Sequence, residues 1–229
     1  MKYKSIFIDL DRTLWDFEAN AKDTFLEMYD KYNLKVISTD FETFHETYRK
    51  INKQLWEEYR NGNIKKEVLK YRRFELTLQE FGVNDTTLAR NLGDDYVNLS
   101  SEKTKLFPDT HSVLAYLKTK YNLYIITNGF EEVQLKKIKN CHLDQYFHQI
   151  ITSEKAGVQK PHADIFQYAL QMASANADTS LMIGDDLEGD IKGARAQGMD
   201  QVFFNPNYMS HDEQCTYEIH ALKELKEIL

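Results

Sequence analysis

Acidic side chains follow two apolar segments of this 229-residue chain, at the point where each segment ends. Residues 5–8 lead into Asp9 and Asp11, and residues 181–184 lead into Asp185. Because residues two apart face the same side of an extended backbone, Asp9 and Asp11 are expected to point into one cleft. Two carboxylates about 4 Å apart repel each other by roughly 4 kcal/mol at an effective dielectric constant of about 20. A bound divalent cation would relieve that repulsion, and carboxylate oxygens suit Mg²⁺.

Two further segments carry groups that could bind a phosphate. Thr127, Asn128 and Gly129 follow the apolar residues 123–126, and a hydroxyl and backbone amides after a strand can donate to phosphate oxygens. Lys160 offers a positive charge that could neutralise both a phosphate and a nucleophile. Each piece alone has an ordinary explanation, as a capping turn, a flexible glycine turn or a solvated lysine before a helix. The chemical interpretation depends on their occurring together in this order.

Residues 184–190 read Gly-Asp-Asp-Leu-Glu-Gly-Asp and crowd four acidic side chains at the end of an apolar segment. Metal binding would explain why like charges gather there. Capping of the next helix by Asp185 or Asp186 would also explain them. Both explanations can hold for different residues of the segment.

Strands and helices must position these groups. Short apolar runs typical of buried parallel strands span residues 5–9, 123–127 and 181–185, and weaker candidates span 149–152, 201–204 and 217–219. Helical spacing is found in residues 108–120, 131–140, 163–173, 187–196 and 222–229. The apolar face of the 131–140 helix is expected to contain Val133, Leu135 and Ile138. The pattern predicts an α/β fold with a Rossmann-like, doubly wound parallel sheet, in which ligands bind at the carboxyl ends of the strands.

The segment from residue 16 to residue 101 differs from the rest of the chain. It contains no proline and no convincing strand, and its Glu, Lys, Tyr, Leu and Phe residues recur at helical spacing. We therefore expect an all-helical domain of four or five helices, inserted into an α/β core formed by residues 1–15 and 102–229.

Composition limits the classes of partner and the compartment. The 29 basic and 36 acidic residues give a formal charge of −7, which opposes binding to a nucleic acid polymer. The two cysteines, Cys141 and Cys215, form no metal or disulfide pattern and suggest a reducing compartment. With no signal peptide and no run of about 18 to 20 apolar residues, a cytoplasmic protein without a membrane span is expected.

Taken in order, these segments resemble the four motifs of the haloacid dehalogenase-like (HAD) hydrolase superfamily. The matching residues are Asp9-Leu10-Asp11-Arg12-Thr13, Ile126-Thr127-Asn128, Lys160-Pro161 and Gly184 to Asp190. The helical insertion looks like the cap domain of many members. Residues 127–130 and 160–170 look most like the branch of pyrimidine-nucleotide 5′-nucleotidases. Arg12 departs from the small or acidic residue usual at its position, and its side chain is expected to affect the entrance or to pair with an acidic neighbour.

The resemblance implies a role for each acidic residue. Asp9 would attack phosphorus and form an acyl phosphate, and Asp11 would protonate the leaving oxygen and then deprotonate water. Asp9, the backbone carbonyl of Asp11 and Asp185 would hold Mg²⁺. Either Asp186 or Asp190 would orient the waters of the metal, and the sequence leaves this choice open.

The resemblance also implies how the phosphate is held. Thr127 and the backbone amide of Asn128 would bind the phosphoryl oxygens, and Lys160 would offset their charge. The cap would close over the substrate and exclude water. Candidates for substrate recognition, each also explained as a core aromatic or a solvated cation, are Trp15, Phe17, Arg49, Trp56, Arg60 and Arg72.

The predicted function is hydrolysis of a small phosphorylated metabolite, with a nucleoside 5′-monophosphate as the preferred substrate. A phosphatase for phosphoglycolate or sugar phosphates and a β-phosphoglucomutase-like mutase share the same motifs and stay open. A 2-haloacid dehalogenase would need neither Mg²⁺ nor a second aspartate, so Asp11 argues against it. A binding protein with an idle site would usually lack the nucleophile or a metal ligand. The oligomeric state does not follow from the sequence.

Overall fold

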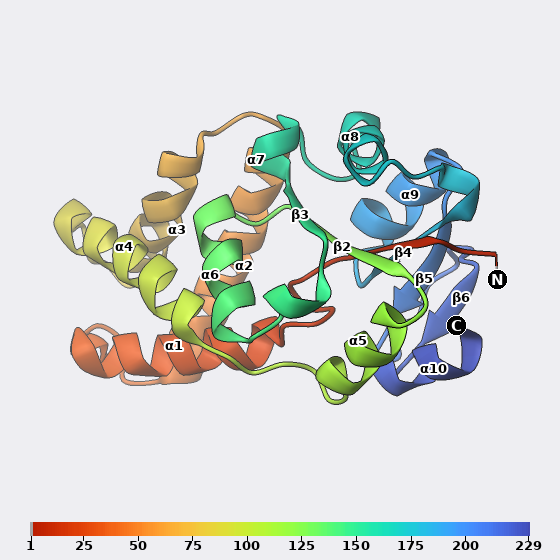
Figure 1. Cartoon of the computed structure of the whole chain (residues 1–229). Coiled ribbons are helices and arrows are strands. Elements are labelled where there is room, and N and C mark those ends of the chain that lie inside the picture. The colour runs from red at the N-terminus through yellow and green to blue at the C-terminus, as the bar shows by residue number, and fades with distance from the viewer. Residues whose placement is uncertain (1) are drawn as a thin grey trace. The chain divides into compact units, whose positions relative to one another are not determined.

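A six-stranded parallel sheet forms the centre of the fold in the computed structural model, which describes residues 2–229 (Figure 1). Its strands are β1 (Ser5–Ile8), β2 (Asn122–Thr127), β3 (Gln149–Thr152), β4 (Ser180–Gly184), β5 (Asp200–Phe204) and β6 (Tyr217–Ile219). They lie in the order β3-β2-β1-β4-β5-β6, and every neighbouring pair is parallel. The predicted α/β fold is confirmed, and the three weaker strand candidates are all strands.

Side chains of the central strands alternate between two apolar layers because a strand points successive residues to opposite faces. Ile6 and Ile8 of β1 join one layer, whereas Phe7 joins the other. All three side chains are at most 1% exposed. A run of apolar residues without polar alternation therefore follows from burial of β1 on both faces.

Helices cover both faces of the sheet. Those in the core are α5 (Thr110–Lys118), α6 (Glu131–Asn140), α7 (Ser153–Ala156), α8 (Ala163–Ala173), α9 (Gly193–Ala196) and α10 (Leu225–Ile228), with short helical turns at Asp144–Tyr146, Ala177–Thr179 and Leu222–Glu224. Residues of α8 and α9 pack in the layer of Phe7, and residues of α5, α6 and α10 pack in the layer of Ile6. The fold is thus a three-layer, doubly wound sheet.

The helix predicted over residues 187–196 differs in detail from the expectation. It consists of one stretch of π-helix at η4 (Leu187–Lys192) followed by the single α-helical turn of α9. π-Helical turns are rare in proteins, and many of those that do occur lie at functional sites. Here the π-helical stretch directly follows the acidic end of β4.

The strand order reverses between β1 and β4, because the chain runs outward from β1 to β2 and β3 before it returns to β4. Ile8 is paired with Ile125 on one side and with Ile183 on the other. The residue after Ile8 is Asp9, so this carboxylate leaves the sheet at the point of reversal. Crevices at such points are the usual ligand sites of open α/β sheets.

Residues Glu18–Lys103 form a separate compact unit, and the other unit contains the chain up to Phe17 together with Thr104–Leu229. Each boundary lies two residues after the predicted one, and the assignment of this unit as a cap domain stays a prediction. The helices are α1 (Phe17–Lys31), α2 (Phe41–Arg60), α3 (Lys66–Glu80) and α4 (Thr86–Glu102), with one 3₁₀ turn at Leu34–Val36. Asp40 and Asp85 cap α2 and α4 through bonds to backbone amides.

The helical unit has an aromatic core. Phe25, Tyr48, Phe74 and Tyr96 lie with ring centroids 4.3 to 6.0 Å apart. The guanidinium of Arg73, which is only 3% exposed, lies 4.8 Å from the ring centroid of Tyr96 and donates to Asn52 Oδ1 at 3.1 Å. Aromatic faces attract a desolvated guanidinium and stabilise its charge within this core.

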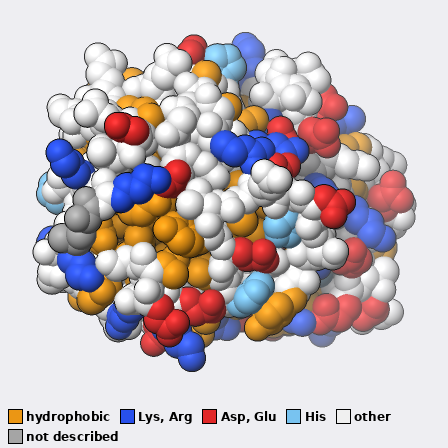
Figure 2. Space-filling view, turned by 90° about the vertical axis from the view of Figure 1, so that its right-hand side faces the viewer, with side chains coloured by type: hydrophobic (Ala, Val, Ile, Leu, Met, Phe, Trp, Pro, Cys, Tyr) orange, Lys and Arg blue, Asp and Glu red, His pale blue; other side chains and the backbone are white. Residues whose placement is uncertain are grey.

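The surface carries charges of both signs. On the face in Figure 2, basic and acidic side chains are interspersed around an apolar patch. Among residues 2–229, no helix combines the length and the apolar character needed to cross a bilayer.

We predict that Phe7→Ala lowers the free energy of unfolding by about 3–5 kcal/mol, because it opens a cavity in a fully buried strand. Phe7 is 0% exposed and stacks on Tyr124 with a centroid distance of 5.1 Å. Urea denaturation followed by circular dichroism measures the change. Met209→Ala is the control, since Met209 is 53% exposed and its truncation should change stability by less than about 0.5 kcal/mol. Equal effects of the two substitutions would contradict the assignment of Phe7 to the core.

Candidate active site

A buried ammonium group links two of the acidic residues at the carboxyl end of the sheet. Lys160 Nζ donates to Asp9 Oδ1 and to Asp190 Oδ1, both at 2.6 Å, and to the carbonyl oxygen of Ile126 at 3.0 Å. These three bonds use all three hydrogens of the ammonium group. The backbone amide of Asp9 donates to the carbonyl of Ile183 at 2.9 Å, which fixes the start of its loop against β4.

Asn128 holds the backbone of Lys160 in place. Its Oδ1 accepts from the Lys160 amide at 2.8 Å, and its Nδ2 donates to the Lys160 carbonyl at 3.0 Å. This reciprocal pair ties the loop after β2 to the loop that carries the lysine. The sequence argument considered only the backbone amide of Asn128, as a phosphate donor, and that role stays a prediction.

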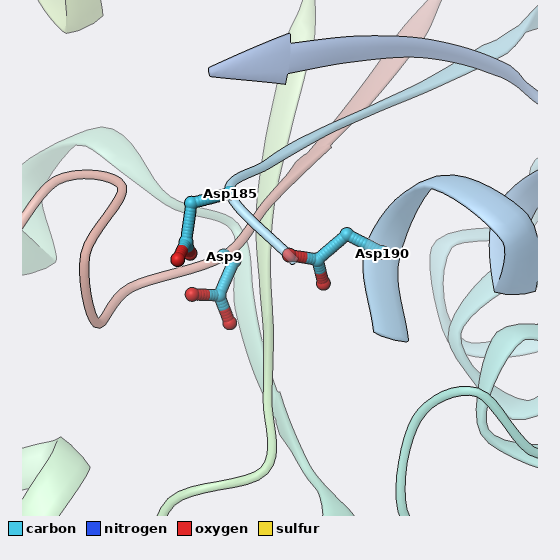
Figure 3. A group of neighbouring side chains, drawn as sticks. All are labelled: Asp9, Asp185 and Asp190. Atoms are coloured by element: carbon cyan, nitrogen blue, oxygen red, sulfur yellow. The ribbon is translucent and has the colours of Figure 1, made fainter. Parts of the chain in front are cut away.

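Three carboxylates lie together: Asp9 after β1, Asp185 after β4 and Asp190 in η4 (Figure 3). One oxygen from each lies within 4.8 Å of the others. Asp185 also accepts from Thr13 Oγ1 at 3.1 Å. Asp11, which was expected to share a cleft with Asp9, is not among the side chains of this cluster, and a metal contact of its backbone carbonyl stays a prediction.

The electrostatics of this cluster favour a divalent cation. Burial raises the pKa of Asp9 to about 7, with the charge of Lys160 opposing the rise and that of Asp190 adding to it. Burial, followed by the charges of Asp9 and Asp190, raises the pKa of Asp185 well above its ordinary value. Burial alone would lower the pKa of Lys160, but the carboxylates of Asp190 and Asp9 raise it above its ordinary value. One ammonium cannot balance three carboxylates, and an all-oxygen donor set fits Mg²⁺.

The structure separates the functions of Asp186 and Asp190. Asp186 caps η4, because its Oδ1 accepts from the amides of Glu188 and Gly189 at 3.0 Å each. Asp190 is 1% exposed and belongs to the carboxylate cluster, while its Oδ2 accepts from the Asp186 amide at 3.1 Å. Of the two residues, Asp190 is therefore the one that would lie close to a metal held by Asp9 and Asp185.

Gly184 makes room for Asp190. A Cβ atom at residue 184 would lie 2.1 Å from Asp190 Oδ2, far inside van der Waals contact. The backbone of Gly184 is an ordinary strand without positive φ. The glycine is thus required by space at the end of β4, and any larger residue would displace a partner of Lys160.

Asp11 lies in a second hydrogen-bonding network. Its Oδ1 accepts from Lys137 Nζ at 2.6 Å and its Oδ2 accepts from Gln134 Nε2 at 2.9 Å. Gln134 is 0% and Lys137 5% exposed, whereas Leu135, which was expected on the buried face of this helix, is 39% exposed. That expectation was wrong because the buried face of α6 contains the polar residues Gln134 and Lys137, which donate hydrogen bonds to Asp11.

Gln134 and Lys137 were not among the predicted site residues. Their spacing of three residues on one helix face, just after the Thr-Asn-Gly segment, was the available signal. Apolar periodicity assigns polar residues such as these to the exposed face of a helix. Their position on the face of α6 toward the strand ends is visible only in the structure.

Gln134 also contacts Thr127. The Thr127 hydroxyl oxygen accepts from Gln134 Nε2 at 2.7 Å and from the Gly129 amide at 3.2 Å. A Cβ atom at Gly129 would lie 2.4 Å from Gln134 Cδ, and Gly129 has no positive φ. The ordinary explanation of this glycine as a source of turn flexibility is therefore wrong, because its missing side chain makes room for an amide.

Arg12 and the candidate recognition residues have partners of several kinds. Arg12 adopts φ 67, a conformation that favours glycine, and its guanidinium lies 4.0 Å from the Phe17 ring centroid. Its charge also opposes the rise in the pKa of Asp185, which agrees with an acidic neighbour. Trp15 is 1% exposed and covered by Lys137, so the structure places it in the core.

The other recognition candidates lie in the helical unit. Arg49 pairs with Glu18 at 3.2 Å and with Glu46 at 3.4 Å, and Arg72 pairs with Glu75. Surface pairs of this kind contribute little to stability and can exchange for a ligand. A substrate role for these residues, and for Trp56 and Arg60, stays a prediction.

Comparisons with known proteins agree with this geometry. A family model described as haloacid dehalogenase-like hydrolase matches residues 3–198. The pyrimidine 5′-nucleotidase YjjG of Escherichia coli (strain K12) is 32% identical over 100% of this chain and 99% of its own length. A glyceraldehyde 3-phosphate phosphatase of Methanothermobacter thermautotrophicus is 28% identical over 99% of both chains. A structure of the HAD-hydrolase YfnB from Bacillus subtilis bound to magnesium has a TM-score of 0.89 and 28% identity, and covers 100% of this chain and 99% of that chain.

We predict that Mg²⁺ stabilises the folded protein, because a cation among Asp9, Asp185 and Asp190 relieves their repulsion. At a Mg²⁺ concentration about 100-fold above its dissociation constant, ligand binding adds about 2.7 kcal/mol, which raises Tm by roughly 5–10 °C for a chain of this size. Differential scanning fluorimetry with Mg²⁺, with EDTA and with KCl of matched ionic strength measures the shift. Asp185→Asn should lose most of it. A shift of equal size in that variant would place the ion elsewhere.

A second prediction concerns the pH dependence of stability without metal. The pKa of Asp9 is raised from 3.8 to about 7 on folding, so its protonation stabilises the folded state, and that contribution is lost as pH rises toward about 7. In EDTA, the stability of Asp9→Asn relative to the natural protein should therefore increase from about pH 5 to about pH 8. Urea midpoints of both proteins across this range measure the difference, and a difference that is constant or decreases would show that Asp9 is not destabilised by burial.

Proposed function

Since the chain belongs to the haloacid dehalogenase-like hydrolase family, we propose that it is a Mg²⁺-dependent phosphatase that transfers a phosphoryl group first to Asp9 and then to water. The observation that carries this proposal is the cluster of Asp9, Asp185, Asp190 and Lys160 at the carboxyl end of the sheet, in which all but the half-buried Asp185 are buried. It combines a nucleophile, a fixed cation and an excess of negative charge that a metal ion can balance.

In the first half of the reaction, a carboxylate oxygen of Asp9 attacks phosphorus as the bond from phosphorus to the leaving oxygen breaks. Asp11 in its protonated form gives its proton to that leaving oxygen and becomes the carboxylate that pairs with Lys137, and an acyl phosphate forms on Asp9. In the second half, water attacks the same phosphorus and passes a proton to Asp11, and the bond from phosphorus to the Asp9 oxygen breaks. Inorganic phosphate leaves, and Asp9 and Asp11 return to their starting states.

The remaining residues hold and neutralise the phosphoryl group. Thr127 Oγ1 already accepts two hydrogen bonds, so its own hydrogen is the group that can donate to a phosphoryl oxygen. Lys160 keeps Asp9 oriented and offsets charge next to it. The amide of Asn128 is proposed as a further donor.

Asp9, Asp185 and the backbone carbonyl of Asp11 are the proposed holders of Mg²⁺, with Asp190 beside them. The bound ion would supply positive charge where the phosphoryl oxygens gather negative charge. The buried, oxygen-only donor set supports this assignment. The alternative of a 2-haloacid dehalogenase would leave the excess carboxylates unexplained.

We propose a nucleoside 5′-monophosphate as the substrate. The full-length similarity to a pyrimidine 5′-nucleotidase supports it, as do the residues Thr127-Asn128-Gly129-Phe130 that resemble this branch. The similarity to a glyceraldehyde 3-phosphate phosphatase supports a small sugar phosphate as the second candidate. Both substrates require the same chemistry at Asp9, so the distinction lies in the residues that contact the alcohol portion.

The test is phosphate release from a panel of phosphate esters, with Mg²⁺ and with EDTA. The panel contains UMP, dUMP, dTMP, purine 5′-monophosphates, phosphoglycolate, glyceraldehyde 3-phosphate and hexose phosphates. We expect Mg²⁺-dependent release that is greatest with a pyrimidine 5′-monophosphate. Asp9→Asn should reduce it to the buffer blank, and Asp11→Asn should reduce turnover of these alkyl esters by about 10²- to 10⁴-fold.

The other outcomes are distinguishable. Release that is greatest with a sugar phosphate keeps the mechanism and replaces the substrate. Conversion of a hexose 1-phosphate to the 6-phosphate without phosphate release would indicate a mutase. Full activity in EDTA, or in Asp9→Asn, would overturn the proposed mechanism.

A further inference from the structure

Asp11 is held by two side chains from a helix that contributes no residue to the proposed chemistry. Each carboxylate oxygen accepts one hydrogen bond, Oδ1 from Lys137 and Oδ2 from Gln134. Two bonds to different oxygens fix both the position and the rotation of a carboxylate. Asp11 is thus held in one orientation although it lies in a loop, outside β1.

Lys137 is built into this position. Its ammonium group is 2.6 Å from Asp11 Oδ1 and lies 3.8 Å from the ring centroid of Trp15, and the residue is 5% exposed. Burial of an ammonium group is costly unless the charge is paired. The carboxylate and the aromatic face supply that compensation on two sides, so neither Lys137 nor Asp11 can turn away without leaving a buried charge.

Gln134 connects Asp11 to the phosphate-binding hydroxyl. Both hydrogens of its amide nitrogen are used, one toward Asp11 Oδ2 at 2.9 Å and one toward Thr127 Oγ1 at 2.7 Å. The reverse orientation of the amide would place its oxygen against a carboxylate, so the network itself determines the orientation. Gln134 therefore links the group that exchanges protons with the group that faces the phosphoryl oxygens.

The amide of Gln134 is retained at a cost. Its Oε1 is buried and accepts no hydrogen bond from the described residues, a position in which an amide without a water or ligand partner would lose about 1–3 kcal/mol. Methionine has a similar shape and would fill the site without that cost. The amide also occupies the space that a side chain at residue 129 would fill, and residue 129 is a glycine. Both features fit a residue whose amide is kept for its bonds to Asp11 and Thr127.

We propose that Gln134 and Lys137 are positioning residues that orient Asp11 for proton transfer, and that Gln134 keeps Asp11 in register with Thr127. This inference rests on the proposed phosphatase function. A proton-transfer group contributes about 10²- to 10⁴-fold to rate, and small misplacements remove much of that contribution. Loss of either positioning residue should therefore damage the proton-transfer step while leaving the nucleophile and the metal site in place.

The leaving group separates this role from others. Departure of p-nitrophenolate needs no proton, whereas departure of the alkoxide of a nucleoside 5′-monophosphate does. The value of kcat/KM includes the steps up to departure of the leaving group. A fault in the orientation of Asp11 should thus lower kcat/KM for the alkyl ester much more than for p-nitrophenyl phosphate.

The experiment measures kcat/KM with Mg²⁺ for p-nitrophenyl phosphate and for the nucleoside 5′-monophosphate that the natural protein hydrolyses fastest. Lys137→Met, which keeps the apolar stem over Trp15, should lose about 10- to 100-fold with the alkyl ester and less than about 3-fold with the aryl ester. Lys137→Arg should recover part of the loss. Lys139→Met makes the same chemical change at an exposed position of α6 and should change neither value.

A double-mutant cycle identifies the group through which Lys137 acts. If it acts through Asp11, Asp11→Asn combined with Lys137→Met should be no slower on the alkyl ester than Asp11→Asn alone. Gln134→Met removes a donor to Thr127 as well, so it should lower both values, with a further loss of about 10-fold for the alkyl ester. This variant also provides the test if Lys137→Met fails to fold.

Failure of the positioning role and failure of the proposed function would give different results. Equal losses with both esters in Lys137→Met, or additive losses in the double variant, would show that Lys137 acts on the phosphate or on the fold, and would overturn the positioning role alone. If the natural protein hydrolyses neither ester, the proposed function fails and this inference fails with it.

Discussion

The ammonium group of Lys160, buried between the carboxylates of Asp9 and Asp190, is the interaction on which the rest of the site depends. Its third bond, to the carbonyl of Ile126, joins it to the end of β2. The ion-paired groups thus come from the end of β1, from η4 and from the loop between α7 and α8. Because a buried charge without a partner is strongly destabilising, the site and the pairing of the central strands form together.

Two aspartates that are two residues apart in sequence each have their own buried lysine. Asp9 pairs with Lys160, and Asp11 pairs with Lys137 from α6. Asp9 also has two carboxylate neighbours, whereas Asp11 has a glutamine amide. Different surroundings allow chemically identical side chains to perform different tasks, which in the proposed mechanism are nucleophilic attack and proton exchange. The separation is produced by the short loop after β1, which turns Asp11 toward α6.

Sequence reasoning predicted the sheet and most of its helices because these depend on local apolar patterns. It also identified Asp9, Asp185 and Lys160 as site candidates, since polar residues at the ends of apolar strands are visible without a structure. It could not pair Asp9 with Asp190 or Asp11 with Lys137, because these contacts join residues 181 and 126 positions apart. It also expected Leu135 in place of Gln134 and Lys137 on the buried face of α6, because periodicity treats every polar residue as exposed. The choice between Asp186 and Asp190 needed the π-helical geometry of η4, which no local pattern indicates.

Gly129 and Gly184 have a consequence for engineering this protein. Replacing glycine by alanine commonly stabilises a protein by restricting the unfolded chain, provided that φ is negative. Neither residue has positive φ, so a survey of backbone angles would select both for such replacement. In each case, however, the added methyl group would overlap a side chain of the site. The entropy gained in the unfolded state would be outweighed by displacement of Gln134 or Asp190, so thermostabilisation guided by dihedral angles alone would damage the catalytic centre first.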